Sequence, residues 1–283
     1  MPNHVIQGAL LILLGEGLLS VMGAIIKHLS GEMPTEHIVF YRNLFGLIML
    51  IPIIMHGGFR QLKTQVIHFH LLRAAVGLSA MYGFFYVIGN MPLAEAFLVK
   101  LTSPFFMPIV AAIWLGETIK PKTGWAIAIG FIGVMFILRP GTEEFTPIAI
   151  IGLVSAALAS TAKVTIRRMS VTESSVRIVF YFGAISTLMS AIPLIWSPLA
   201  LTLSQLPWIA LMGLVATLGQ LALTKAYRIA NPGQIGPYVY SSVVYGACLG
   251  WVFWGETLLL TTIIGSGLII AAGIWNVSGK QTS

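Results

Sequence analysis

Long apolar segments follow one another along almost the whole chain of 283 residues. Polar residues, glycine and proline divide the chain into ten such segments. They lie near residues 5–27, 36–56, 68–89, 94–116, 121–139, 147–167, 174–195, 206–227, 233–254 and 257–277. A helix needs about 20 apolar residues to cross a bilayer. Since only 9% of the residues are charged, we predict an all-α membrane protein of ten transmembrane helices, with no room for a soluble domain.

Basic residues are distributed unevenly over the connections between these segments. Nine fall on one set of alternate connections and the tail, and only Lys27 and Arg139 fall on the other set. The nine are Arg60, Lys63, Lys120, Lys122, Arg167, Arg168, Lys225, Arg228 and Lys280. Because cytoplasmic loops carry the excess of Lys and Arg, both termini are predicted to be cytoplasmic. This bias explains the net charge of +7 without a nucleic-acid partner. No basic residue precedes the first segment, so we interpret it as a retained helix, not a signal peptide.

An internal repeat relates the two halves of the chain. Ile38-Val39-Phe40-Tyr41 recurs 140 residues later as Ile178-Val179-Phe180-Tyr181. Gly116-Glu117-Thr118 recurs 139 residues later as Gly255-Glu256-Thr257. The repeat unit is five helices, and five is odd, so the second copy enters the membrane from the opposite side. We therefore expect two inverted five-helix units, residues 1–140 and 141–283.

Two inverted halves can exchange conformations, which opens the centre of the protein to each side in turn. This architecture favours a secondary transporter. A channel would need a selectivity filter or rings of like charge, and a membrane enzyme would need a convergent catalytic set, whereas the chain has no Asp. A lipid flippase or scramblase is a further alternative. The single Cys248 and the spacing of the six His give no metal-ligand pattern. We therefore expect no metal and no cofactor. No P-loop motif occurs, so transport is expected to use ion gradients or facilitated exchange.

Charged residues inside the apolar segments are candidates for a binding site, because a charge at the centre of a membrane helix costs about 2.5–3.5 kcal/mol. Glu16 lies in the middle of the first segment. It is either the partner of a buried cation or a carboxylate that couples protons or binds substrate. Lys100 is expected to contact the substrate or to pair with Glu16 or Glu95. Arg42 is also two turns deep, while Arg73, Lys163 and Arg177 are close enough to the cytoplasmic face to extend towards it.

Aromatic and hydroxyl side chains add further candidates. Tyr82 and Tyr86 share a face of the third helix, and with Tyr240 they could stack on a planar substrate or pack between helices. Ser103 and Ser242 occupy equivalent positions in the two halves.

Proline interrupts equivalent helices of the two halves. Pro104 and Pro108 lie in the fourth helix and Pro237 in the ninth, which predicts a site and a hinge there. Glu117 and Glu256 follow these helices. We interpret both as gates or as caps of the helix that comes next. Small residues in the fifth and tenth helices predict close packing, namely Gly130, Gly133, Gly265, Gly267 and Ala271.

Several motifs resemble those of one transporter superfamily. In the first half they are Pro92-x-Ala94-x-Ala96, Ser103-Pro104 and Trp114-Leu115-Gly116-Glu117. In the second half they are Asn231-Pro232-Gly233, Tyr240-Ser241-Ser242 and Trp254-Gly255-Glu256. Over nearly its whole length the chain resembles the drug/metabolite transporter superfamily, EamA type. The resemblance implies a central cavity lined by the first, third, fourth, sixth, eighth and ninth helices. It also implies a cargo such as an amino acid, a vitamin or S-adenosylmethionine. Arg42 and Arg73 are similar in position to residues of the riboflavin and S-adenosylmethionine uptake members.

These observations predict a secondary transporter of a small polar metabolite in a bacterial-type inner membrane, and not an enzyme. Embedded cations outnumber embedded acids, so the expected cargo is anionic or zwitterionic, such as an amino-acid derivative. A vitamin or cationic-metabolite importer that uses Glu16 is the alternative. The expected partners are the cargo, the bilayer and a coupling proton or ion, and the chain would be a monomer or homodimer. The predicted binding residues are Glu16, Arg42, Arg73, Tyr82, Tyr86, Lys100, Ser103, Tyr240 and Ser242.

Overall fold

Helices account for almost all of the chain. The computed structural model describes residues 2–58, 62–116, 118–119, 121–138, 147–169, 172–198, 201–229 and 235–277, and no strand occurs in this part. The first half contains α1 (Pro2–Ser30), α2 (Thr35–Gly57), α3 (Ile67–Asn90), α4 (Leu93–Lys100), α5 (Ser103–Leu115) and α6 (Pro121–Leu138). The second half contains α7 (Ile148–Met169), α8 (Ser175–Ala191), η2 (Pro193–Ile195), α9 (Leu206–Ile229), η3 (Gly236–Tyr240), α11 (Ser241–Trp254) and α12 (Leu260–Val277).

The helices match the predicted membrane segments. If α4 with α5, α8 with η2, and η3 with α11 are each taken as one segment, the described residues form ten helical segments. Within the described part of the chain, seven spans are long and apolar enough to cross a membrane, and α4 with α5 counts as one of them. The helices α6 and α12 are apolar but shorter. The prediction of an all-α, ten-helix membrane protein is confirmed.

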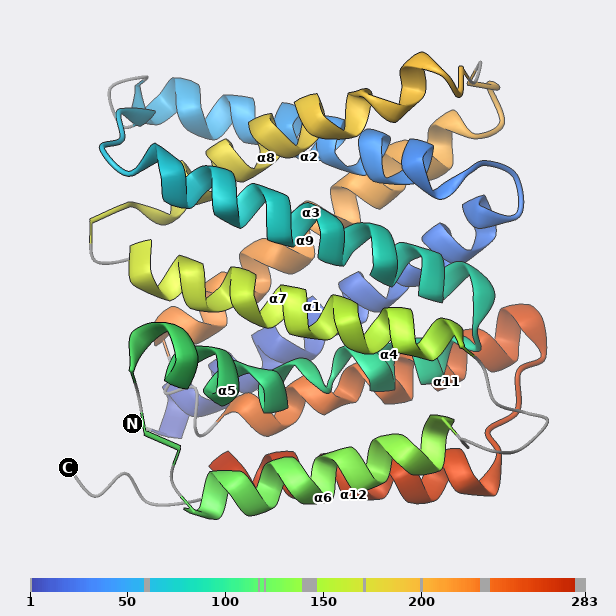
Figure 1. The fold of residues 1–283 in the computed structure, drawn as a ribbon. Helices are drawn as coiled ribbons and strands as arrows, with labels where there is room; N and C mark the ends of the chain where they lie inside the picture. Colours follow the sequence, from blue (N-terminus) through green and yellow to red (C-terminus); the bar gives the residue numbers. More distant parts are fainter. Residues whose placement is uncertain are drawn as a thin grey trace.

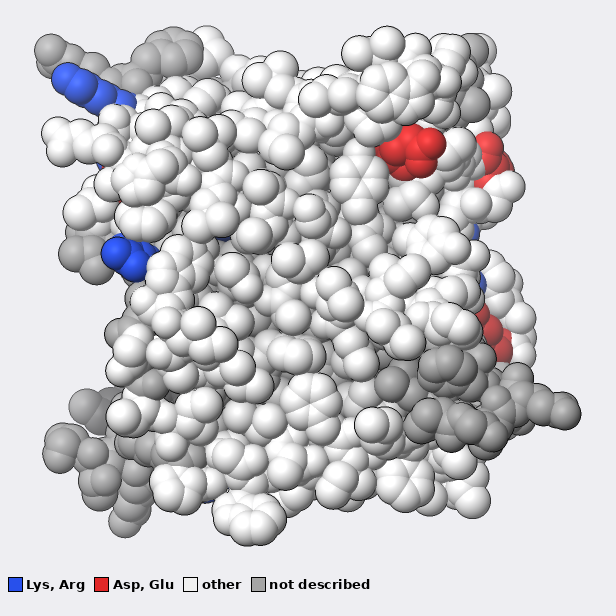
Figure 2. All heavy atoms as spheres, viewed as in Figure 1, with Lys and Arg blue, Asp and Glu red and all other residues white. Residues whose placement is uncertain are grey.

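The two ends of the bundle differ in charge. In Figure 1, α1 begins and α12 ends on the left, where α2 connects to α3 and α7 to α8. In Figure 2 the larger patches of Lys and Arg lie at this end, and the acidic atoms lie at the opposite end. We call these the basic end and the acidic end. The sides of the bundle between them show almost no charge in this view, as a lipid-facing surface requires.

Contacts between helices come in matched pairs. In an inverted repeat α1 is equivalent to α7, and α3 to α9. The extensive contacts of α1 with α9 and of α3 with α7 are therefore copies of each other. The pairs α2–α8 and α6–α12 each join a helix to its own equivalent. The expected boundary between residues 140 and 141 lies outside the described residues.

Two equivalent helices are interrupted, as the prolines predicted. The helix α4 ends at Lys100, and after Leu101 and Thr102 the chain begins α5 at Ser103, with a proline in the first turn. In the second half the short 3₁₀-helix η3 also has a proline in its first turn and precedes α11. Because proline lacks an N–H and cannot continue a helical hydrogen-bond ladder, each break leaves helix ends within the bundle.

Glycines allow α6 and α12 to approach closely. A methyl group at Gly133 would lie 2.7 Å from the carbonyl oxygen of Gly265, which is closer than real contacts allow. The prediction of close packing is confirmed at these two positions. It is wrong at Gly267, where an added methyl group would meet no atom within 4 Å. Gly130 contacts the ring of Phe105 in α5 instead of α12.

Candidate functional site

The break between α4 and α5 places a lysine beside the buried acid of α1. Glu16 is 4% exposed, and its Oε2 lies 3.9 Å from the Nζ of Lys100, the last residue of α4. The Lys100 ammonium group also lies 5.8 Å and 5.5 Å from the ring centres of Phe84 and Phe97, within the range of a cation–π interaction. The expected pairing of Glu16 with Lys100 is therefore observed.

Helix α7 of the second half meets the same break. Lys163 Nζ donates a hydrogen bond to Ser103 Oγ at 3.0 Å. Ser160 Oγ donates to the carbonyl oxygen of Ser103 at 2.7 Å and lies 2.9 Å from its hydroxyl oxygen. Lys163 was expected to extend towards the cytoplasmic face, but its ammonium group turns to Ser103, because the start of α5 offers it an acceptor. We call Glu16, Lys100, Ser103, Ser160 and Lys163 the central cluster.

The central cluster is suited to an anionic group. It holds two ammonium groups and the N-terminus of a 13-residue helix, and an N-terminus carries a partial positive charge. Glu16 is the acid that opposes them, and its Oε2 has no hydrogen-bond partner among the described residues. The cluster can therefore attract an anion while keeping one carboxylate for an ammonium group or a proton.

A second basic site lies between α2, α3 and α8. Arg73 Nε and Nη1 and Arg42 Nε are buried and have no hydrogen-bond partner in the described part of the chain. Arg42 donates to Asn43 Oδ1 at 3.2 Å. Arg73 lies 3.9 Å over the ring of Phe182 in α8, with its guanidinium against Gly77 of its own helix. Because Gly77 follows Arg73 by one turn towards the middle of α3, the side chain does not extend to the basic end. We call Arg42 and Arg73 the arginine pair.

Glu256 closes the acidic end of the bundle. Its carboxylate forms an ion pair with Lys27 at the end of α1 and accepts a hydrogen bond from the backbone N–H of Leu93 at 2.7 Å. Lys27 also donates to the carbonyl oxygen of Met91 at 2.7 Å. We call these contacts the Lys27–Glu256 bridge. Glu256 caps a helix, as predicted, but the helix is α4 and not the following α12. Glu117 lies outside the described residues.

The remaining predicted residues do not join either basic site. The hydroxyl of Tyr82 is buried and has no hydrogen-bond partner among the described residues. It lies half a turn around α3 from Arg73. Tyr86 is 42% exposed. Tyr240 packs against α12, where a methyl group at Gly273 would overlap its hydroxyl. Ser242 is buried and donates to the carbonyl oxygen of Val239 at 3.0 Å.

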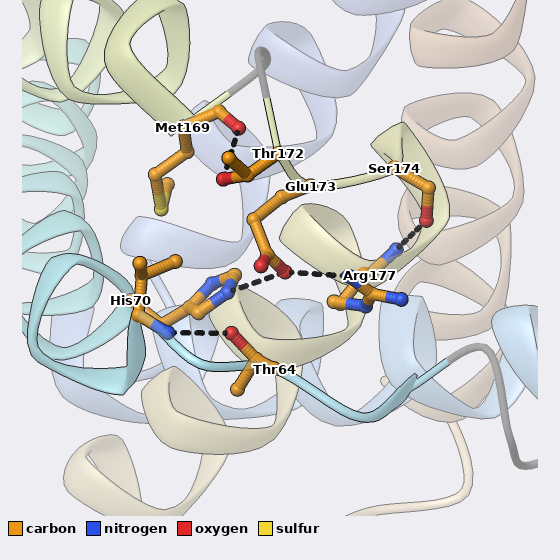
Figure 3. Close-up of polar contacts among 8 residues, drawn as sticks. Thr64, His70, Met169, Thr172, Glu173, Ser174 and Arg177 are labelled. Atoms are coloured by element: carbon orange, nitrogen blue, oxygen red, sulfur yellow. Dashed lines mark hydrogen bonds and ion pairs between the residues drawn. The ribbon is translucent and has the colours of Figure 1, made fainter.

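A polar network at the basic end was not predicted. Figure 3 shows Glu173, in the α7–α8 connection, between His70 of α3 and Arg177 of α8. Its Oε2 lies 3.3 Å from His70 Nε2 and 3.1 Å from Arg177 Nη1. Burial by itself raises the pKa of this carboxyl, but hydrogen bonds with Arg177, His70 and Thr64 outweigh it and lower the pKa below its ordinary value. Arg177 therefore forms an ion pair instead of extending to the surface, and a loop acid between basic segments gave no sequence signal for this.

Comparisons with known proteins identify the family. The EamA-like transporter family matches residues 6–139 and 146–278. The chain belongs to this family. It is 34% identical to the pseudopaline exporter CntI of Pseudomonas aeruginosa over 271 residues, which cover 95% of each chain. It is 26% identical to an S-adenosylmethionine uptake transporter of Rickettsia bellii, over 90% of this chain and 88% of the relative.

Two more distant similarities agree with this assignment. A riboflavin transporter of Brucella anthropi is 24% identical over 86% of this chain and 87% of its own. A solved crystal structure matches with a TM-score of 0.68 over 97% of both chains at 16% identity, which shows the fold alone. The chain is thus a multi-pass membrane transporter of the drug/metabolite superfamily, and the family and its relatives indicate a transporter rather than an enzyme.

Proposed function

We propose that this protein is a secondary transporter of a small anionic or zwitterionic metabolite, such as an amino-acid derivative, which it moves by alternating access. The observation that carries the proposal is the central cluster. Two lysines and the start of α5 converge where a membrane helix is broken, and each inverted half contributes to the contact through α5 and α7. A site shared by both halves can be exposed to either side as the halves move against each other.

The proposal includes an orientation. We place the basic end in the cytoplasm of a bacterial-type inner membrane, because Lys and Arg concentrate on cytoplasmic connections. The termini would then be cytoplasmic, and the Lys27–Glu256 bridge would hold the opposite side closed in this conformation.

A screen of thermal stability tests the charge of the cargo. The purified protein is heated with a panel of amino acids, their carboxylated derivatives, vitamins, nucleosides and lipids, because a true ligand raises the melting temperature by mass action. We expect anionic and zwitterionic compounds to stabilise the wild type, with most of that shift lost in Lys100→Gln. Stabilisation by cations or lipids alone would overturn the proposal.

A cationic-metabolite or vitamin importer is the second candidate, favoured by one observation. Glu16 is buried in α1, and its Oε2 has no hydrogen-bond partner among the described residues, so it could accept one from a positively charged cargo. In this case Glu16→Gln would abolish uptake of a cationic compound in liposomes containing the protein. Retained uptake in that variant would rule this candidate out.

A further inference from the structure

Three buried nitrogens of the arginine pair, Arg42 Nε and Arg73 Nε and Nη1, have no acceptor among the described residues. Arg42, Arg73 and Asn43 all carry buried side-chain nitrogens without a partner in the described part of the chain. Asn43 itself is only 1% exposed. One turn beyond Phe182, Ser186 of α8 is fully buried, and its hydroxyl has no partner among the described residues either. Buried donors are almost always satisfied in native structures, so this group is built for an acceptor that comes from outside the chain.

The charges of the arginine pair are also unbalanced. No acidic side chain of the described residues forms an ion pair with Arg42 or Arg73, and two like charges repel each other. In contrast, Arg177 has Glu173 and Lys27 has Glu256. Two unpaired guanidinium groups near each other in a bundle destabilise it. If these arginines were structural, we would expect a carboxylate beside them. The excess positive charge therefore points to the binding of an anionic group.

A glycine lies one turn along the helix from each member of the arginine pair. Gly77 lets the Arg73 guanidinium lie flat along α3 towards the middle of the bundle, because any Cβ there would collide with Nη1. Gly46 lies one turn beyond Arg42, and an added methyl group there would meet no atom within 4 Å. A planar guanidinium presents paired N–H donors that match the two oxygens of a carboxylate or phosphate.

We propose that the arginine pair is a second oxyanion subsite of the transporter, separate from the central cluster. The cargo then carries two charged ends. A carboxylate or phosphate binds Arg42 and Arg73, while a zwitterionic or second anionic end binds Lys100, Lys163 and Glu16. This inference rests on the proposed function and narrows the cargo to a metabolite with at least two separated charged groups.

Stability without any ligand provides the first test. Arg73→Met removes an unpaired charge and keeps an unbranched side chain, and Arg177→Met serves as the matched control because Arg177 has Glu173 as its partner. We expect Arg73→Met to melt at or above the wild-type temperature and Arg177→Met to melt lower. If Arg73→Met lowers the melting temperature as much as Arg177→Met, the arginine pair is structural and the proposal fails.

Ligand selectivity provides the second test, with glutamate and glutamine as matched probes, together with citrate, inorganic phosphate and chloride. Glutamate and citrate should stabilise the wild type more than glutamine, and this difference should disappear in Arg73→Met. Gly77→Ala keeps the charge but displaces the guanidinium, so it should also weaken the preference. Gly124→Ala is the control, since a methyl group at this helical glycine meets no atom within 4 Å.

The outcomes separate the two proposals. An unchanged preference for glutamate in both Arg73→Met and Gly77→Ala would overturn the oxyanion subsite while leaving the proposed function intact. Stabilisation by phosphate alone would assign the site to phosphorylated cargo, and stabilisation by chloride alone would overturn the claim that the cargo fills it. If no probe raises the melting temperature of Lys100→Gln, while Arg73→Met responds to the probes as the wild type does, the central cluster is supported and the oxyanion subsite is contradicted.

Discussion

At the scale of single residues, depth in the membrane matters less than the partner a charge can reach. Glu16 and Lys100 were both expected at depth, and the structure brings them within 3.9 Å. Lys163 and Arg177 were expected to extend to the surface, yet each found a partner, in Ser103 and Glu173. Position along one helix predicts depth, but only the packing of several helices decides which acceptor lies closest.

The Glu16–Lys100 pair should contribute measurably to stability. Lys100→Gln removes the ion-pair partner of the buried Glu16. Because Lys100 is 34% exposed, we expect a loss of about 2 kcal/mol, below the range for breaking a fully buried pair. The double variant Glu16→Gln with Lys100→Gln should recover most of that loss, since neither member of the ion pair is left without the other. Thermal denaturation of Glu16→Gln, Lys100→Gln and the double variant measures the coupling between the two residues. Simple additivity of the two single changes would show that the residues do not interact.

The Glu173 carboxylate should make the protein sensitive to acid. Its pKa is lowered in the folded protein, so its stabilising contribution is complete above the unfolded pKa of about 4.3 and is lost as the pH falls towards the folded value. Melting temperatures of the wild type and of Glu173→Gln are compared between pH 7 and pH 3. We expect Glu173→Gln to melt lower at pH 7 and the two curves to converge in acid. Parallel curves would contradict the account.

At the scale of elements, ties between the ends of helices hold the broken segments in place. The helix α4 has only eight residues and would be marginal alone, because short helices gain little from their own hydrogen bonds. Glu256 caps its first residue and Ser160 bonds the start of the helix that follows. Both supporting residues come from the second half of the chain, so the two halves stabilise each other at the break.

Loss of the Lys27–Glu256 bridge should loosen the acidic end. Glu256→Gln removes the negative charge that pairs with Lys27 and accepts the hydrogen bond of the Leu93 N–H. We expect the folded protein to lose about 1–3 kcal/mol of stability, as for other charge-assisted hydrogen bonds. Glu32→Gln is the control, because its pairing with His28 is exposed and exposed pairs contribute little. Equal melting temperatures for the two variants would show that the bridge does not hold α4.

Close contact between α6 and α12 should tolerate no methyl group at its centre. Gly133→Ala places a Cβ against the backbone of Gly265, which cannot move aside as a side chain would, so we expect a lower melting temperature. Gly267→Ala in α12 meets open space and should be neutral or slightly stabilising. If both variants behave alike, the helices are not packed through Gly133.

At the scale of the whole molecule, the sequence predicted the fold better than the site. Hydropathy, proline breaks and the repeat depend on local spacing, which is why ten helices and two interruptions were predicted correctly. The bilayer requires this pattern, because every backbone N–H and C=O group must find a hydrogen-bond partner within the membrane-spanning segment. The site depends on which helices meet. Ser160, Glu173 and the role of Gly77 became visible only when α7 and α8 were placed against α3 and α5.

The orientation of the bundle can be measured with cysteine labelling. After Cys248→Ser, single cysteines at Glu32 and Lys63 are tested with a membrane-impermeant maleimide, because both positions are exposed at opposite ends. We expect the cysteine at position 32 to react in intact cells and that at position 63 only after permeabilisation. The reverse pattern would place the basic end outside the cell.

Transport by the central cluster can be measured directly in liposomes. Liposomes containing the protein are loaded with a small-molecule extract of bacterial cells, and mass spectrometry identifies what leaves them. The wild type should release specific anionic or zwitterionic metabolites, and so should Lys225→Gln, which removes an exposed lysine of α9. The double variant Lys100→Gln with Lys163→Gln should release none of them. Release of the same anionic metabolites by the double variant at the wild-type rate would contradict the account.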